Sequence, residues 1–224
     1  MNRADVIIAI QKQEAEFFKR LTNKPIVTVG HLIALHPPSA PAYNNHELLF
    51  VGAITRDNQR GIEFFIKEIL PRIQSKLPNV KLFLAGNICD AVDNSPACVK
   101  LGVVDDLGEI YQRAAIVINP AYTGTGLAIK SIEALSYAKP LITTPKGARG
   151  LEDGMGHAFG VAQSAQDFAD KIIQLLENEE LRKMLSQKAY DYACNYHQMS
   201  FDNLSEVMQK EHKTQKGYYG AIQK

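Results

Sequence analysis

Short runs of apolar, often β-branched residues alternate along this chain with longer segments in which apolar residues recur at helical spacing. The runs predict strands at residues 4–10, 25–29, 48–51, 81–85, 103–104, 115–119 and 141–144. The helical spacing predicts helices at residues 14–21, 62–77, 107–113, 127–137, 165–177, 179–196 and 201–212. Strands without polar alternation are typical of a parallel sheet that is covered on both faces. The predicted fold class is therefore α/β, a doubly wound, Rossmann-like parallel sheet.

A proline-rich stretch divides the chain unequally. Residues 31–46 contain this stretch and predict a linker. Before it, residues 1–30 hold only a strand, a helix and a strand, and after it residues 47–204 hold the alternating elements of a main domain. We expect residues 205–224 to form a terminal helix and a frayed tail. Within the main domain, Pro71 falls inside a helical segment and predicts an end or a kink there.

Composition and charge exclude several classes of protein. Of the 224 residues, 46% are apolar and 22% are charged, which excludes a disordered or fibrous chain. The formal net charge is only +1, so that nucleic acid is not indicated as a partner. No apolar run approaches the roughly 20 residues of a transmembrane helix. The first run is broken at Gln11, Lys12 and Glu14, and predicts no signal peptide.

Cysteine and histidine form no metal-ligand pattern. Cys89, Cys98 and Cys194 lack the spacing of a zinc site, and the six histidines are scattered. Reduced thiols are the simplest interpretation of the three cysteines. We therefore expect no metal site and a cytoplasmic protein, and a peripheral position at the inner face of the membrane stays open.

The segment after the fourth strand of the main domain carries the strongest chemical signal. Gly124 and Gly126 lie between the end of that strand and a helix that begins near Leu127. Glycine lets the backbone approach a ligand closely, and the first N–H groups of a helix are unpaired and lie at its positive end. Lys130 lies in the first turns of this helix, where its ammonium can reach a diphosphate. The segment predicts a site for an anion, most simply a phosphate.

Lys130 and Glu133 share one face of this helix because they are three residues apart. One interpretation is that they form a solvated surface pair. The other is that Glu133 binds a ligand, because its apolar neighbours Ile132 and Ala134 place it near the rim of the core. A carboxylate there requires N–H or hydroxyl partners, and the hydroxyls of a ribose would satisfy it.

Seven motifs fall in the order and spacing of one family. They are FVG at residues 50–52, LFLAG at 82–86, GVVDDL at 102–107, NP at 119–120, EAL at 133–135, AKPLITT at 138–144 and GARGL at 147–151. Together with the Gly-x-Gly turn and Lys130 they resemble the donor-binding domain of glycosyltransferase family 4. Residues 4–9, with Glu14, look like the closing segment of that family's other domain.

The resemblance implies a GT-B protein, in which two Rossmann-like domains enclose the active site. It also implies that the C-terminal domain binds a nucleotide-diphospho-sugar, such as a UDP- or GDP-sugar, and that transfer retains the anomeric configuration without a metal or other cofactor. The backbones of Gly126 and Leu127 would then hold the phosphates, and the backbone of Val104 the base. Glu133 resembles the second Glu of the Glu-x7-Glu motif, which binds the ribose. The remaining expected binding residues are Gly52, Gly124, Thr125 and Lys130.

The sequence departs from the family's pattern at two places. Many relatives carry an Arg and a Lys after the first strand that neutralise the leaving diphosphate, whereas Ala53 follows that strand here. We expect Lys130 to act as the catalytic cation together with Arg60, which either substitutes for the missing cations or is an exposed loop arginine. Thr125 stands eight residues before Glu133, so the first carboxylate of the motif is absent. Relatives with a Gly-x-Gly-x-x-x-Lys-x-x-Glu pattern also lack it.

The predicted activity is the donor-binding part of a hexosyltransferase-type enzyme that acts on an unknown glycan, lipid or protein acceptor. Only residues 1–30 match an acceptor-side domain, as a remnant. Two alternatives therefore stay open: a non-catalytic partner or regulatory subunit that keeps the fold, and one half of a split glycosyltransferase completed by a separate acceptor-domain polypeptide. A dinucleotide-dependent oxidoreductase is disfavoured because no Gly-x-Gly-x-x-Gly follows the first strand.

Overall fold

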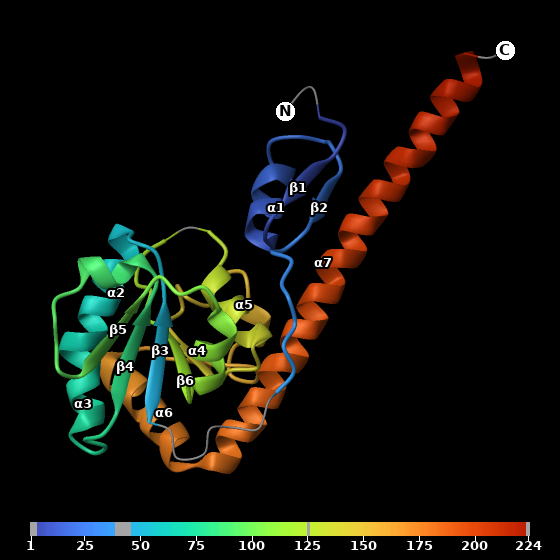
Figure 1. Ribbon diagram of the computed structural model, residues 1–224. Helices are drawn as coiled ribbons and strands as arrows, with labels where there is room; N and C mark the ends of the chain where they lie inside the picture. Colours follow the sequence, from blue (N-terminus) through green and yellow to red (C-terminus); the bar gives the residue numbers. More distant parts are fainter. Residues whose placement is uncertain (1–3, 39–45, 125, 223–224) are drawn as a thin grey trace. The chain divides into compact units, whose positions relative to one another are not determined.

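The computed structural model describes residues 4–38, 46–124 and 126–222 (Figure 1). The strands in this part of the chain are β1 Ile7–Ala9, β2 Ile26–Thr28, β3 Glu47–Val51, β4 Lys81–Ala85, β5 Cys98–Gly102, β6 Ile116–Asn119, β7 Leu141–Thr143 and β8 Gly160–Val161. The α-helices are α1 Lys12–Lys19, α2 Arg56–Phe64, α3 Leu70–Gln74, α4 Leu107–Arg113, α5 Ile129–Ser136, α6 Ala165–Glu177 and α7 Glu179–Ile222. A π-helical turn, Phe65–Ile69, joins α2 to α3, and short 3-10 helices span Asn87–Ala91 and Glu152–Gly154.

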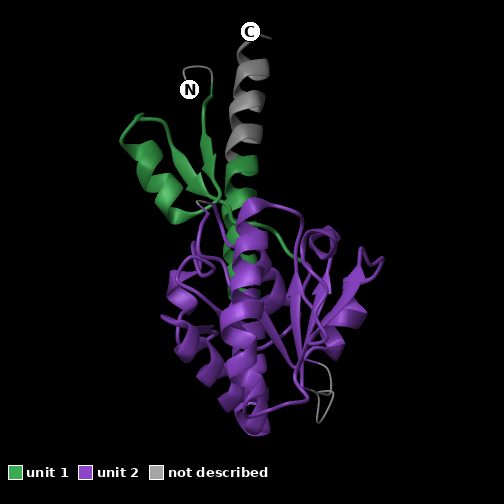
Figure 2. Cartoon of the chain, turned by 90° about the vertical axis from the view of Figure 1, so that its left-hand side faces the viewer, with its two compact units in different colours: residues 1–33, 194–224 green, residues 34–193 purple. Residues whose placement is uncertain are grey.

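The chain divides into two compact units (Figure 2). Unit 1 comprises Met1–Ile33 and Cys194–Lys224, and unit 2 comprises Ala34–Ala193. Helix α7 begins in unit 2 and ends in unit 1. These boundaries differ from those of the four segments predicted from the sequence, residues 1–30, 31–46, 47–204 and 205–224. That division stays a prediction.

Unit 1 is a small parallel pair of strands with two helical segments. β1 and β2 pair in parallel, with Ile7 opposite Ile26, and α1 forms the connection between them. The segment after β2 is held by α7: the Gly30 N–H donates to Ser200 Oγ at 3.2 Å, and the His31 N–H donates to the Tyr196 hydroxyl at 3.0 Å. These hydrogen bonds join the two stretches of chain that make up unit 1.

Unit 2 contains a six-stranded parallel sheet in the order β5-β4-β3-β6-β7-β8. Counted from β3, this is the order 3-2-1-4-5-6 of a doubly wound Rossmann sheet. The direction of winding reverses between β3 and β6, where Leu48 lies opposite Ile116. The predicted α/β class is therefore confirmed, and the reversal marks the place where such sheets bind their ligands.

Helices cover both faces of this sheet (Figure 1). One face packs α2, α3 and α6 over alternate strand residues such as Leu48 and Phe50, and the Phe65 and Phe168 rings meet edge to face, 5.6 Å between centroids. α4 and α5 lie against β3, β6 and β7 on the other face. Alternation of the buried side chains between two covered faces explains why the central strands are apolar throughout.

The structure corrects three of the predicted elements. The strand expected at residues 103–104 is wrong: β5 ends at Gly102, whose φ of 70° turns the chain out of the sheet, and Val103 is 78% exposed. β5 and the two-residue β8 were not predicted, because neither has a continuous apolar run. The helices expected at residues 179–196 and 201–212 are one continuous helix, α7.

The regular α-helix is interrupted by a π-helical turn just before Pro71. Pro71 lies in the first turn of α3, directly after the π-helical turn. Proline has no N–H to donate and its ring clashes with the carbonyl four residues earlier, so a regular α-helix cannot continue through it. The wider π turn carries the chain past this point.

Candidate functional site

The carboxyl ends of β3 and β6 frame the predicted site. The loop after Val51 leads into α2, and the loop after Asn119 leads into α5, which carries Lys130 and Glu133. Both loops therefore lie at the reversal point of the sheet. The fold brings together there the two segments that the sequence singled out.

The turn before α5 requires glycine at position 124, whereas position 126 has room for a side chain. Gly124 has a φ of 118°, which L side chains rarely adopt, and a Cβ at Gly126 would meet open space. The Ala128 N–H donates to the Arg149 carbonyl at 3.0 Å, which attaches the start of α5 to the loop after β7. Thr125 lies outside the described residues. An exposed turn that opens onto the start of a helix suits an anion.

A buried polar network fixes the base of this turn. Asn119 Nδ2 donates to Ser131 Oγ at 2.9 Å, and Ser131 Oγ donates to the Gly147 carbonyl at 2.5 Å. Thr143 Oγ1 donates to the Asn119 carbonyl at 2.8 Å. The network ties β6, α5 and the loop after β7 together, so that the start of α5 has one position. Sequence reasoning missed it, because its hydrogen-bonded partners are up to 24 residues apart.

Lys130 reaches across the reversal point to α2. Its Nζ donates to Asn58 Oδ1 at 2.7 Å and lies 5.9 Å from the centre of the Phe50 ring. Asn58 is held in turn, because its Nδ2 donates to the Ala53 carbonyl at 2.8 Å and its N–H to Thr55 Oγ1 at 3.1 Å, the cap of α2. Lys130 is half-buried, and burial lowers the pKa of its ammonium. The sequence did not indicate Asn58 as its partner.

Two carboxylates act on Lys130 in the opposite sense to burial. The charges of Glu133 and Asp57 both raise its pKa, and so both favour the ammonium form. Asp57 lies in the first turn of α2, where it accepts a hydrogen bond from Thr123 Oγ1 of the loop after β6. The two carboxylates that act on Lys130 thus come from both sides of the reversal point, Asp57 from α2 and Glu133 from α5.

Glu133 lies one helical turn before Tyr137, which belongs to a stack of three rings. The Tyr111 and Tyr137 rings are stacked with their centroids 4.2 Å apart. The His36 ring is also stacked on Tyr137, with a centroid distance of 4.0 Å. Burial raises the pKa of both tyrosines, and the Glu133 charge raises it further. The His36 N–H donates to the Ser136 carbonyl at 2.8 Å. Glu133 therefore lies on the α4 side of Lys130.

The other predicted residues are spread along the same edge of the sheet. Gly52 is buried after β3, and its N–H donates to the Ala85 carbonyl at 2.9 Å. Val104 is half-buried in the loop between β5 and α4. Arg60 is exposed on α2, two residues beyond Asn58, and therefore on another side of that helix.

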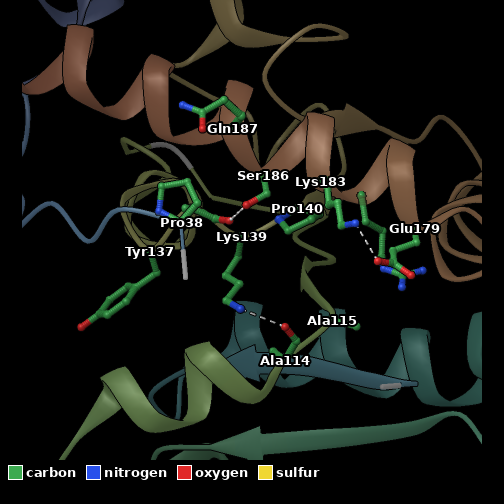
Figure 3. Close-up of a pocket in the computed structure, with 12 residues that line it drawn as sticks. Pro38, Ala114, Ala115, Tyr137, Lys139, Pro140, Glu179, Lys183, Ser186 and Gln187 are labelled. Atoms are coloured by element: carbon green, nitrogen blue, oxygen red, sulfur yellow. Dashed lines mark hydrogen bonds and ion pairs between the residues drawn. The ribbon is translucent and has the colours of Figure 1, made fainter. Parts of the chain in front are cut away.

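A cavity of about 250 Å³ lies at the opposite, amino edge of the sheet (Figure 3). Lys139 points across it, and its Nζ donates to the Gln112 and Ala114 carbonyls at 3.0 and 3.1 Å, at the end of α4. Burial lowers the pKa of Lys139 to about 8. None of the described residues of the predicted anion site lines this cavity, so we assign the candidate site to the carboxyl edge.

Within the described part of the chain, no group of three or more His, Cys, Asp or Glu residues has the arrangement of a metal site. Nor does any helix there have the length and apolar character needed to cross a membrane.

One known family matches most of unit 2. The family described as glycosyl transferases group 1 matches residues 45–178. An uncharacterised 44.6 kDa protein in the cps region of Klebsiella pneumoniae is 23% identical over 203 residues, which cover 84% of this chain and 51% of that protein. An uncharacterised glycosyltransferase of Methanocaldococcus jannaschii is 24% identical over 158 residues, 66% of this chain and 43% of that protein.

Among solved structures, S. aureus TarM in complex with fondaparinux, alpha-GlcNAc-glycerol and UDP has a TM-score of 0.76 at 16% identity. The match covers 93% of this chain and 44% of TarM. The chain thus spans about half the length of the relatives that it matches.

Proposed function

Because the chain belongs to the group 1 glycosyltransferases and has their GT-B fold, we propose that unit 2 binds a nucleotide-diphospho-sugar at the carboxyl edge of its sheet. The donor is a UDP- or GDP-sugar, its transfer retains the anomeric configuration, and neither a metal nor another cofactor takes part. A second domain binds the acceptor, which is a glycan, a lipid or a protein. UDP in the TarM complex supports this class of donor.

The observation that carries this proposal is the position of the Lys130 ammonium. It lies 2.7 Å from Asn58 Oδ1, so that α2 and α5 together determine its place. Relatives with cations after the first strand would supply them from the α2 side, whereas this chain has Asn58 there and Lys130 reaches it from α5. A fixed cation beside the start of a helix stabilises the negative charge that develops on a leaving diphosphate.

The remaining contacts follow the same edge of the sheet. Glu133 lies one turn beyond Lys130 toward α4, where its carboxylate accepts hydrogen bonds from the ribose. The loop at Val104 precedes α4 and provides backbone groups for the base. The backbones of Gly52, Gly124, Gly126 and Leu127 approach the phosphates, and Arg60 stays a candidate for a second cation.

Titration calorimetry with UDP, GDP and ADP tests the binding of the donor. We expect one of the three to bind the full chain at millimolar concentration or below, and to raise its melting temperature because it binds only the folded state. Lys130→Met should weaken that affinity about 10- to 100-fold, the range expected for about 1.5–3 kcal/mol of charged hydrogen bonding. Lys76→Met is the matched control, since Lys76 is exposed and lies before the amino end of β4.

Two results would contradict the proposal. Absence of binding for all three nucleotides would remove the donor site, and equal affinity in Lys130→Met and Lys76→Met would remove the diphosphate role of Lys130. The alternative, a non-catalytic partner that keeps the fold, predicts nucleotide binding without transfer. A split enzyme predicts that transfer appears only when a separate acceptor-domain polypeptide is added.

A further inference from the structure

Asp57 presents a carboxylate that the proposed contacts with the nucleotide do not use. It lies in the first turn of α2, and Thr123 Oγ1 donates to its Oδ1 from the loop after β6. Both residues stand at the reversal point of the sheet, on the two segments that border it. The hydrogen bond therefore joins the two sides of the proposed donor site.

Close packing holds these two segments in place. A Cβ at Gly61 of α2 would lie 2.3 Å from the Pro120 carbonyl oxygen, which shows that the helix and the loop meet backbone to backbone. One helical turn on, the Phe64 and Tyr122 rings meet edge to face with centroids 4.8 Å apart. Asp57 is thus presented by a rigid helix whose position against the loop is fixed at two points.

Asp57 and Glu133 lie on different sides of Lys130. Lys130 reaches from α5 to Asn58, the neighbour of Asp57 on α2, whereas the charge of Glu133 acts on Tyr111 of α4. Glu133 is therefore on the side of α4 and Asp57 on the side of α2. The order along the site is Glu133, Lys130, Asp57.

The chemistry of a nucleotide sugar matches this order. The ribose and the diphosphate are assigned to Glu133 and Lys130, so the next part of the donor, beyond the diphosphate, is the transferred sugar. A carboxylate repels phosphate but accepts hydrogen bonds from hydroxyls. Thr123 uses only part of the acceptor capacity of Asp57, because an ionised carboxylate has about four lone-pair sites.

We propose that Asp57 is a specificity-determining residue that accepts hydrogen bonds from hydroxyl groups of the transferred sugar. This inference rests on the proposed function of the site. The ligand class is a nucleotide-diphospho-hexose with hydroxyls in reach of α2. The loop before α5 has Thr125 in place of a carboxylate, and Asp57 of α2 supplies one from the other side of the reversal point.

Calorimetric titration of the full chain with UDP, UDP-glucose, UDP-N-acetylglucosamine, GDP and GDP-mannose tests the inference. For the nucleotide that binds, we expect Asp57→Asn to leave the affinity for the diphosphate within about twofold. The additional affinity of the matching nucleotide sugar should fall about tenfold or more, as expected when a hydrogen bond to a charged group is lost. Asp93→Asn, at an exposed position outside the site, should change neither affinity.

The outcomes separate this inference from the function on which it rests. Failure of the unaltered chain to bind any nucleotide would overturn both. Equal weakening of diphosphate and nucleotide sugar in Asp57→Asn would make Asp57 a support for Lys130 and overturn the sugar contact, as would no change in either affinity. Asp57→Glu, which keeps the charge, should retain more of the sugar-dependent affinity than Asp57→Asn if both variants have the melting temperature of the unaltered chain.

Discussion

Gly86 provides a stringent test of how the site is built. It follows β4 with a φ of 95°, and a Cβ there would lie 2.3 Å from the carbonyl oxygen of Gly52. Gly102, at the end of the neighbouring strand, has a φ of 70° and open space around its Cβ position. The two glycines are joined by a hydrogen bond, from the Gly86 N–H to the Gly102 carbonyl at 2.7 Å. Replacing each by alanine separates backbone strain from steric overlap.

The expected magnitudes differ. At Gly86, an unfavourable φ costs about 1–3 kcal/mol and overlap with the Gly52 backbone about 1–3 kcal/mol more. At Gly102 only the left-handed conformation contributes, about 1–2 kcal/mol. Each alanine regains about 0.4–1 kcal/mol by restricting the unfolded chain. Gly86→Ala should therefore lower the free energy of unfolding by about 2–5 kcal/mol, and Gly102→Ala by about 1 kcal/mol or less.

Urea unfolding followed by far-ultraviolet circular dichroism measures both variants. For a chain of this size about 1 kcal/mol corresponds to about 2–4 °C, so melting temperatures provide a second readout. Equal losses in the two variants would refute the reasoning, because they would show that the approach of Gly86 to Gly52 relaxes at no cost. A loss below about 1 kcal/mol in Gly86→Ala would do the same.

Two further predictions concern the support of the sheet edges. Ser131→Ala leaves Asn119 Nδ2 and the Gly147 carbonyl without their buried partner and should lower the free energy of unfolding by about 2–4 kcal/mol. As a control, Ser75→Ala at an exposed position should lower it by less than about 0.5 kcal/mol in the same urea titration. Similar losses in both variants would contradict a stabilising role of the buried network. The pKa of Lys139 is lowered to about 8, so between about pH 8 and pH 10 the unfolded chain binds the extra proton and stability rises with pH. Relative to Lys139→Met, the free energy of unfolding of the unaltered chain should rise by about 1–2 kcal/mol across that pH range. This is less than the full pKa shift implies, because the two carbonyls favour the ammonium. A difference between the two proteins that does not change with pH would contradict the prediction.

The sequence predicts the centre of the sheet better than its edges. β3, β4, β6 and β7 are buried on both faces, and their continuous apolar residues reveal them directly. β5 is half-buried along its length and includes Lys100, while β8 has two residues, one of them Gly160. A pattern of continuous apolar residues therefore does not detect these two strands, which lack such a run.

The same limit applies to the candidate site. Gly124, Gly126 and Lys130 share one local segment, so their spacing indicates an anion site. The partnership of Lys130 with Asn58 spans 72 residues, and that of Thr123 with Asp57 spans 66. The residues of α2 alone do not predict either contact, because both depend on how α2 packs against the loop after β6 and the start of α5.

Unit 1 draws its parts from distant stretches of the chain, and this affects how the protein is made. The Gly30 N–H meets Ser200 Oγ across 170 residues, and Asn203 Nδ2 meets the Thr28 carbonyl across 175. At about 5–20 residues per second, the ribosome needs on the order of 10–30 s to pass from one partner to the other. Unit 2 is one continuous stretch of the chain and can fold during that interval. β1 and β2 are thus synthesised well before their partners in α7, and unit 1 is completed only after α7 has emerged.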